Sequence, residues 1–249
     1  KRIGQVTEKL VPFMALLYIV LSVGVILLNI QNIPHVFRMI FEGAFSPKAV
    51  TGGLVGSLFI SLKKGVSRGI FSNEAGLGTG SIAHACADTR KPVKQGMFGI
   101  FEVFMDTIVI CTMTALVILC SGCKIPYGID TGAKLTISAF SVVYGRFGKL
   151  IVTAFLTVFA YATILGWSFY GVRCTRYLFG CKAEPWYFAL QTAAVLLGAV
   201  MNTSVVWKTA EVFNGLMAIP NLLVLLLLSP VLKSVTNSYT RESSIRKWR

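Results

Sequence analysis

The 249-residue chain contains few charged residues, and acidic ones are the scarcest. Charged side chains make up 14% of the sequence, with 10 Asp and Glu against 24 Lys and Arg, whereas soluble domains carry about a quarter charged residues. Hydrophobic residues make up 55% of the chain, and the mean hydropathy is +0.71. This composition excludes an ordinary soluble domain and indicates an all-α integral membrane protein.

Groups that could perform catalysis or hold a structural metal are also scarce. The two histidines, His35 and His84, are far apart in the sequence, and Cys120-x-x-Cys123 lacks the second cysteine pair of a zinc site. No Ser, His and carboxylate set suggests an enzyme, and no repeated pore element or charged ring suggests a channel. We therefore expect no catalytic residue, no organic cofactor and no metal beyond a transported ion, and we interpret the cysteines as free thiols.

The basic residues occur mostly in short segments between hydrophobic runs. A nucleic-acid-binding protein would instead show a basic stripe on a soluble face, so we expect no nucleic-acid partner. Five runs have the roughly 20 residues needed to cross a bilayer, and residues 49–62 form a shorter sixth run. The six predicted crossings are 11–31, 49–62, 95–120, 149–171, 185–203 and 211–231.

Counting the short run as a crossing makes the charge distribution consistent. Segments 1–10, 63–94, 172–184 and 232–249 then lie on one side and hold 17 of the 24 Lys and Arg residues. The positive-inside rule assigns that side to the cytoplasm. Residues 1–231 are thus predicted to form the transmembrane domain and 232–249 a basic cytoplasmic tail, with both ends cytoplasmic. Apolar residues at helical spacing in 33–45 predict an amphipathic helix in the outer interface.

Glycines interrupt the short crossing. An unwound stretch within a membrane persists only where it is buried or lines a cavity, and transporters use such broken helices to bind substrate and ions. A tight glycine contact between helices is the alternative interpretation. The candidate substrate-binding residues here are Thr51, Gly52, Gly53, Gly56 and Ser57.

The 95–120 run carries two carboxylates one helical turn apart, Glu102 and Asp106. Asp106 is near the middle of the run, where a carboxylate needs a cation, a proton or a polar partner. Thr107 adds a hydroxyl, and hard cations prefer oxygen ligands. We therefore predict cation binding by Asp106 and Thr107, and a structural hydrogen bond to another helix is the alternative.

Several polar motifs resemble those of the alanine-or-glycine:cation symporter family. The most specific is Arg-Gly-Ile-Phe-Ser-Asn-Glu-Ala-Gly at 68–76, followed by Gln95-Gly96 and Asp106-Thr107. Further matches are Thr-Ile-Leu-Gly-Trp-Ser-Phe-Tyr-Gly at 163–171 and Asn-Gly-Leu-Met-Ala-Ile-Pro-Asn at 214–221. The resemblance implies a sodium-coupled symporter that moves a small neutral amino acid, alanine or glycine, across a prokaryotic plasma membrane by alternating access. Family members are roughly twice this length, so the chain looks like a C-terminal half.

The resemblance also implies a fold and roles for individual residues. The fold would be a LeuT-like core of two five-helix inverted repeats, with 49–62 as the second broken helix. Thr163 would bind the cation, and Trp167 would line the substrate cavity unless it is an interfacial belt residue. From its placement at the inner mouth, the segment with Arg68, Asn73 and Glu74 is interpreted as a gate or loop-fixing element, in which Arg68 and Glu74 are able to pair, ahead of a helix within 75–87.

Two alternatives remain open from the sequence. The coupling ion could be H⁺ acting through Asp106 instead of Na⁺, and the chain could be a truncated fragment without transport of its own. The expected partners are the amino acid, Na⁺ and the lipid bilayer, with no obligate protein partner.

Overall fold

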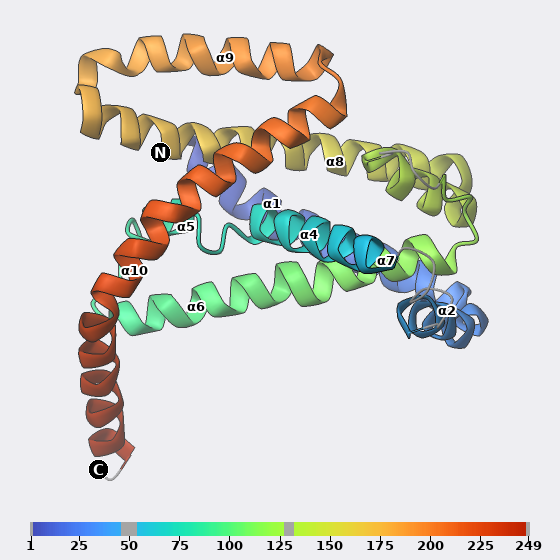
Figure 1. Cartoon of the computed structure of the whole chain (residues 1–249), viewed down its shortest axis with the longest axis horizontal. Helices are drawn as coiled ribbons and strands as arrows, with labels where there is room; N and C mark the ends of the chain where they lie inside the picture. Colours follow the sequence, from blue (N-terminus) through green and yellow to red (C-terminus); the bar gives the residue numbers. More distant parts are fainter. Residues whose placement is uncertain (1, 46–53, 127–131, 248–249) are drawn as a thin grey trace. The chain divides into compact units, whose positions relative to one another are not determined.

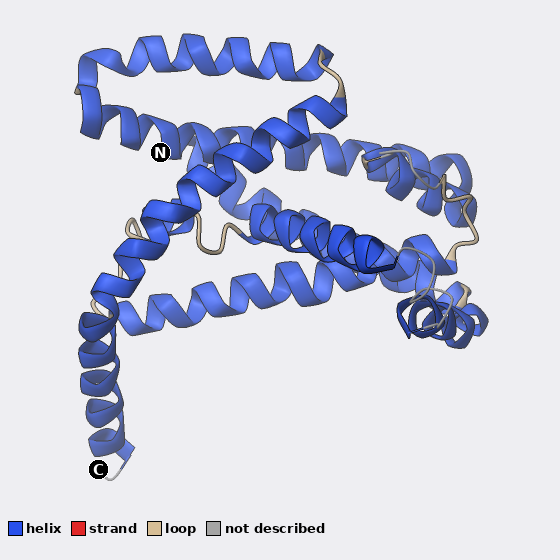
Figure 2. Cartoon of the chain, in the orientation of Figure 1, coloured by secondary structure: helices blue, strands red, loops and turns tan. Residues whose placement is uncertain are grey.

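The computed structural model describes residues 2–45, 54–126 and 132–247. These residues form helices joined by short connections, and no strand occurs among them (Figure 2). The prediction of an all-helical protein is therefore confirmed for the described part of the chain. The chain divides into two compact units, one comprising Lys1–Lys63 and Ile108–Gln191, the other Lys64–Thr107 and Thr192–Arg249.

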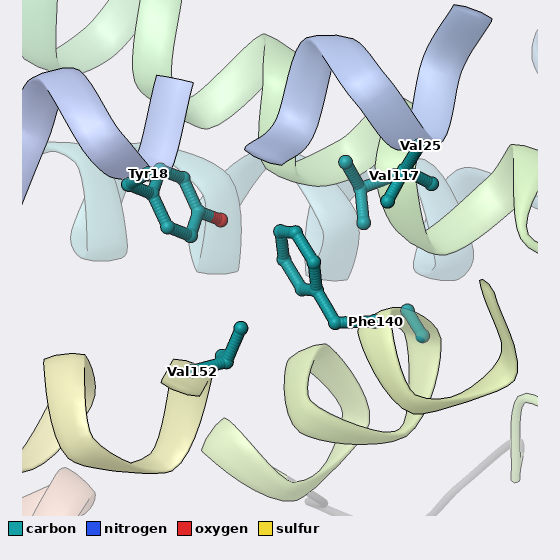
Figure 3. Packing of buried hydrophobic residues seen from close by; sticks show 6 residues of the cluster. Tyr18, Val25, Val117, Phe140 and Val152 are labelled. Atoms are coloured by element: carbon teal, nitrogen blue, oxygen red, sulfur yellow. The ribbon is translucent and has the colours of Figure 1, made fainter. Parts of the chain in front are cut away.

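Unit 1 is built around three helices that pack through apolar side chains. Its elements are α1 (Arg2–Leu28), η1 (Ile30–Asn32), α2 (Ile33–Phe45), the start of α4 (Leu54–Asn73), the end of the π-helix η2 (Met105–Ile110), α7 (Cys111–Cys120), α8 (Ala133–Phe179), η3 (Cys181–Ala183) and the first part of α9 (Glu184–Val200) (Figure 1). Figure 3 shows Phe140 and Val152 of α8 facing Tyr18 and Val25 of α1, with Val117 of α7 beside them. The Tyr18 hydroxyl completes this core by a 2.6 Å hydrogen bond to the Thr114 hydroxyl.

A kink lets two parts of α8 contribute to the same core. Gly145 has φ 60° and ψ −145°, a conformation that side-chain-bearing residues rarely adopt. Phe140 precedes the kink and Val152 follows it, and both are fully buried in the core. Residues 133–148, which the sequence places in a connection, are therefore part of α8, because the helix gains its stability from packing on α1.

A polar contact joins the end of α8 to the start of α9. Arg176 and Glu184 form an ion pair with two hydrogen bonds. Arg176 Nε donates to Oε1 of Glu184, and Nη2 donates to Oε2 at 3.0 Å. The hydrogen bond from the Arg176 guanidinium lowers the pKa of the Glu184 carboxyl. The carboxylate also lies at the N-terminus of α9, where a negative charge is favourable.

The amphipathic segment at 33–45 forms α2, so the predicted helix is confirmed with the same bounds. Val36 is buried, whereas Phe37 and Phe41 are exposed. Arg38 and Glu42 pair on the polar side, with 2.6 Å between Nε and Oε1. Its location in the membrane interface stays a prediction.

Unit 2 contains the rest of α4, the short helix α5 (Thr79–His84), α6 (Pro92–Phe104), the start of η2, the end of α9 and the long helix α10 (Thr203–Lys247). Residues 232–247, predicted as a tail, continue α10 as helix. Four helical stretches are long and apolar enough to cross a membrane: Val11–Leu28, Pro92–Cys120, Ala133–Phe179 and Thr203–Glu242.

The predicted crossings at 49–62 and 185–203 are not among these four. The helix over the first of them, α4, carries Lys63, Lys64 and Arg68, and α9 has only 17 residues. The arrangement with six crossings therefore stays a prediction, while a multi-pass membrane protein follows from the four apolar helices.

Candidate functional site: a helix break in unit 2

The helix that begins at Leu54 stops at Asn73 and resumes as α5 at Thr79. The expectation of a loop at 63–73 is wrong, because these residues are helical. Gly56 and Ser57 lie within the same continuous helix, so the predicted interruption at Gly56 is also wrong. Thr51, Gly52 and Gly53 lie outside the described residues. The helix break that the structure shows is therefore at 74–78, within the most specific sequence motif.

Backbone geometry explains why the helix ends here. Glu74, Gly76 and Gly78 have φ values of 54°, 84° and 86°. Glycine adopts such values freely, whereas a residue with a side chain pays of order 1 kcal/mol or more and persists there only when its surroundings hold it. The Asn73 side-chain oxygen accepts a 2.9 Å hydrogen bond from the Ala75 amide and so closes the turn. Only Thr79–His84 of the predicted 75–87 helix is helical.

The last two side chains of α4 pair with two consecutive residues of the next span. The Ser72 hydroxyl donates to Asp106 Oδ2 at 2.7 Å, and Asn73 Nδ2 donates to Thr107 Oγ1 at 3.0 Å. Asp106 and Thr107 lie in η2, a π-helical turn, and such turns are frequent at functional sites. The structure thus brings three predicted site residues together and adds Ser72, which the sequence did not assign to cation binding.

This arrangement has the chemistry of a cation site. Asp106 supplies a negative charge, and Ser72 and Thr107 supply hydroxyl oxygens. The last carbonyl groups of α4 carry the negative end of the helix dipole at the same place. Oxygen ligands and a net negative charge suit a hard cation such as Na⁺.

Asn221 of α10 holds the helix break from a distant part of the sequence. Its Nδ2 donates a 2.9 Å hydrogen bond to the Gly76 carbonyl. A Cβ on Gly78 would lie 3.0 Å from Asn221 Oδ1, so the asparagine also approaches the second glycine closely. The motif at 214–221 therefore has a structural role that follows from its position on α10, and sequence spacing could not have shown it.

A pocket of about 910 Å³ adjoins the break within unit 2. The helices α5, α6 and α10 contribute its walls together with the 74–78 segment. Residues from these elements that line it include Glu74, Gly76, Ser81, Gln95, Gly96 and Asn221. The pocket has room for a small ligand next to backbone groups that the helix break leaves outside the regular hydrogen-bond ladder.

Arg68 contacts α10, and the predicted pair with Glu74 is wrong. Its Nη2 lies 3.8 Å from Glu211 Oε1, and its guanidinium lies 3.4 Å from the centroid of the Trp207 ring. Phe71 meets the same indole at a ring-centroid distance of 5.4 Å. A separation of six residues does not place two side chains on one helix face, whereas Trp207 and Glu211 are one turn apart and meet Arg68 together.

Thr163 and Trp167 lie one turn apart on α8, in unit 1. The Thr163 hydroxyl donates to the Phe159 carbonyl at 2.9 Å, which leaves the oxygen lone pairs able to accept a cation. Trp167 is half-buried, its ring meets Tyr170 edge-on at 6.0 Å, and its carbonyl accepts a hydrogen bond from Tyr187. The roles predicted for these two residues stay predictions.

Comparison with known proteins identifies the family. The model of the sodium:alanine symporter family matches residues 1–248. The sodium/alanine symporter AgcS of Methanococcus maripaludis is 43% identical over 249 residues, which are 99% of this chain and 53% of the relative. The probable sodium/glutamine symporter GlnT of Bacillus subtilis is 36% identical, with 99% of this chain and 51% of the relative covered.

A third relative, the sodium/proton-dependent alanine carrier protein of Bacillus sp. PS3, is 32% identical, with 92% of this chain and 54% of the relative covered. The chain thus spans about half the length of the curated relatives it matches. These named relatives are transporters, and their similarity extends over nearly all of the chain. The chain belongs to the sodium:alanine symporter family.

Proposed function

We propose that this chain forms part of a sodium-coupled symporter for a small neutral amino acid, alanine or glycine, that works by alternating access. One observation carries the proposal: the helix ends at Asn73 before the break at 74–78, and the last two side chains of α4 donate hydrogen bonds to Asp106 and Thr107 of the π-helical turn η2. Broken helices that expose backbone groups beside polar side chains are the usual ion and substrate sites of secondary transporters. The names of the relatives support cation coupling and an amino acid as the cargo.

The cation is proposed to bind at the end of α4. Asp106 supplies the charge, and Thr107 and Ser72 supply neutral oxygens. In unit 1, Thr163 is proposed in its own right as a cation-binding residue, because its hydroxyl proton is already donated to the Phe159 carbonyl and its lone pairs remain able to accept a cation. The hydrogen bond from the Ser72 hydroxyl gives the Asp106 carboxylate a polar partner, which also fits the alternative of a structural bond.

The amino acid is proposed to bind beside the break at 74–78. The substrate-binding roles of Thr51, Gly52, Gly53, Gly56 and Ser57 stay predictions. Backbone N–H and C=O groups at 74–78 would hold the charged ends of the amino acid. In unit 1, Trp167 stays a proposed substrate-binding residue. Asn73 and Glu74 would then lie at the site itself, with Arg68 as a gate contact to α10. In a LeuT-like plan, α4 and α5 together would occupy the place of the second broken helix.

We further propose that both ends of this chain face the cytoplasm of a prokaryotic cell, as the basic segments indicate. The test uses the complete protein with its native cysteines replaced. Lys124→Cys, in the connection before α8, should react with an impermeant maleimide added outside intact cells. Lys182→Cys, in the connection before α9, should react only after permeabilisation, and the opposite pattern would overturn this orientation.

Uptake of labelled alanine and glycine into proteoliposomes tests the function. The complete protein should accumulate one of them when an inward Na⁺ gradient is imposed and should not when K⁺ replaces Na⁺. Accumulation driven by a pH gradient alone would establish the proton-coupled alternative. No accumulation under either gradient, with the protein folded and inserted, would rule out the proposed function.

A further inference from the structure

A histidine of α5 lies between two polar side chains of α6, outside the proposed cation site. His84 Nδ1 is 2.8 Å from Gln95 Nε2, and His84 Nε2 is 3.5 Å from Glu102 Oε2. Gly99 lies between these two residues on α6, and a Cβ there would come within 3.3 Å of His84 Nε2. The glycine therefore leaves the imidazole ring the room it needs to reach Glu102.

Glu102 needs such a partner because of where it lies. It belongs to Pro92–Cys120, one of the stretches apolar enough to cross a membrane. A carboxylate within a membrane span is costly unless it is protonated or paired. His84 is the group that the structure places beside it, and histidine is the side chain that ordinarily changes charge between pH 5 and 8.

The pair has the charge balance of a site for one proton. With one proton bound, the pair is either imidazolium with carboxylate or imidazole with carboxylic acid, and both forms have a net charge of zero. Without that proton, imidazole and carboxylate together leave a charge of −1 in the span. A proton bound by the pair would therefore remove this net charge from the span.

Gln95 suits both states of the imidazole. Its amide nitrogen can donate to an unprotonated Nδ1, and a rotated amide can accept from a protonated Nδ1 through its oxygen. Gln95-Gly96 is one of the motifs that resemble the symporter family, and the sequence assigns it no role. Contact with His84 supplies one.

Few other charges face this pair. His84 lines the same pocket as Glu74, and no further titratable side chain lines it among the described residues. On the α10 side the lining residues are the uncharged Asn221 and Leu225. Lys91, at the start of α6, is paired with Glu242 of α10, with 2.8 Å between Nζ and Oε1.

We propose that His84, which lines the pocket, and Glu102 beside it form a proton-binding site separate from the proposed cation site at Asp106. Proton binding itself does not depend on the function proposed above. Its consequence does: a proton at this site would make amino-acid uptake depend on pH, because the pocket wall would change charge between its two states.

Nuclear magnetic resonance of the complete protein in nanodiscs, with ¹³C-labelled histidine, tests the binding directly. The signal missing from His84→Gln, or from His84→Asn if the first variant misfolds, belongs to His84. It should titrate once between about pH 5 and 8. Glu102→Gln should change the pH dependence of this signal, because it removes the carboxylate beside His84 Nε2. Glu42→Gln, which removes a carboxylate elsewhere, should leave the midpoint unchanged.

A His84 signal that stays constant from pH 4.5 to 9, or a midpoint that ignores Glu102→Gln, would overturn the proposal. Uptake measurements separate this outcome from failure of the proposed function. In the working transporter, His84→Gln should remove the pH dependence of uptake, whereas His35→Gln should keep it. If wild-type protein shows no uptake at all, the proposed function fails and the titration still decides the proton site.

Discussion

Within each of the two units, a different kind of contact holds the helices together. All of the fully buried hydrophobic residues among the described residues except Leu77 belong to unit 1. Unit 2 is instead joined by polar pairs: Ser72 with Asp106, Asn73 with Thr107 and Asn221 with the Gly76 carbonyl. An apolar core favours one close-packed arrangement, whereas polar groups can exchange one partner for a ligand. The comparison favours unit 2 as the place of the proposed site at the helix break and unit 1 as the more rigid part.

Helix interruptions in the two units show the same contrast. The kink of α8 at Gly145 is flanked by Phe140 and Val152, which fill the space against α1. The break of α4 at 74–78 adjoins a pocket of about 910 Å³. A glycine-containing interruption thus stabilises packing in one unit and leaves room for a ligand in the other.

The largest expected effect breaks the core of unit 1. Phe140→Ala should destabilise the protein by about 3–5 kcal/mol, because it removes a fully buried ring and leaves a cavity. Thermal unfolding in detergent measures the loss, and Phe147→Ala on the same helix, 68% exposed, is the matched control. The half-saturating Na⁺ concentration of protein that stays folded should not change. If both variants unfold alike, α8 does not owe its position to this core.

The next largest effect is expected at the end of α4. Asp106→Asn should raise the Na⁺ concentration for half-maximal uptake by about ten- to a hundredfold, since a charge-assisted contact contributes about 1.5–3 kcal/mol. Asp88→Asn, an equal charge change in the α5–α6 connection, should have little effect. If Asp106→Asn leaves the Na⁺ dependence unchanged, Asp106 does not bind the cation and its hydrogen bond with Ser72 is structural.

Thr163 tests whether unit 1 contributes a ligand in addition to scaffold. Thr163→Ala should raise the half-saturating Na⁺ concentration about fivefold, the effect of one neutral oxygen ligand worth about 1 kcal/mol. Because linkage is reciprocal, it should also weaken substrate affinity at subsaturating Na⁺. Thr157→Ala removes the same kind of bond, 2.8 Å from the Thr153 carbonyl, and should change neither quantity. If Thr163→Ala, like Thr157→Ala, changes neither the half-saturating Na⁺ concentration nor the substrate affinity, Thr163 does not bind the cation and α8 is scaffold at this position.

The smallest effect is expected for substrate size. Trp167→Ala should improve uptake of larger amino acids relative to alanine by a few fold, because a shortened wall admits a longer side chain. Competition for labelled alanine uptake by unlabelled amino acids measures this preference. Trp186→Ala, an exposed tryptophan of α9, is the control. An unchanged order of competitors would leave Trp167 as a packing or interfacial residue.

Much of the fold followed from local sequence. Apolar runs of membrane-spanning length predicted the helices at 11–31, 95–120, 149–171 and 211–231, and each lies within or overlaps a stretch able to cross a bilayer. Spacing of apolar residues predicted α2 with its observed bounds. Prediction from the sequence was wrong where local signals conflict. Lys63, Lys64 and Arg68 read as loop charges, yet α4 passes through them, since long basic side chains extend from a helix to polar surroundings.

The sequence by itself determined that this is a helical membrane protein of the symporter family and that Asp106 and Thr107 are its candidate cation ligands. Tertiary structure alone decided where the functional break falls, which residues complete the site and which partner Arg68 takes. The physical reason is that these groups are far apart in the sequence and meet only when the helices pack. Asn221 is 145 residues from the carbonyl it holds, and Ser72 is 34 residues from Asp106. No pattern along the chain encodes those contacts.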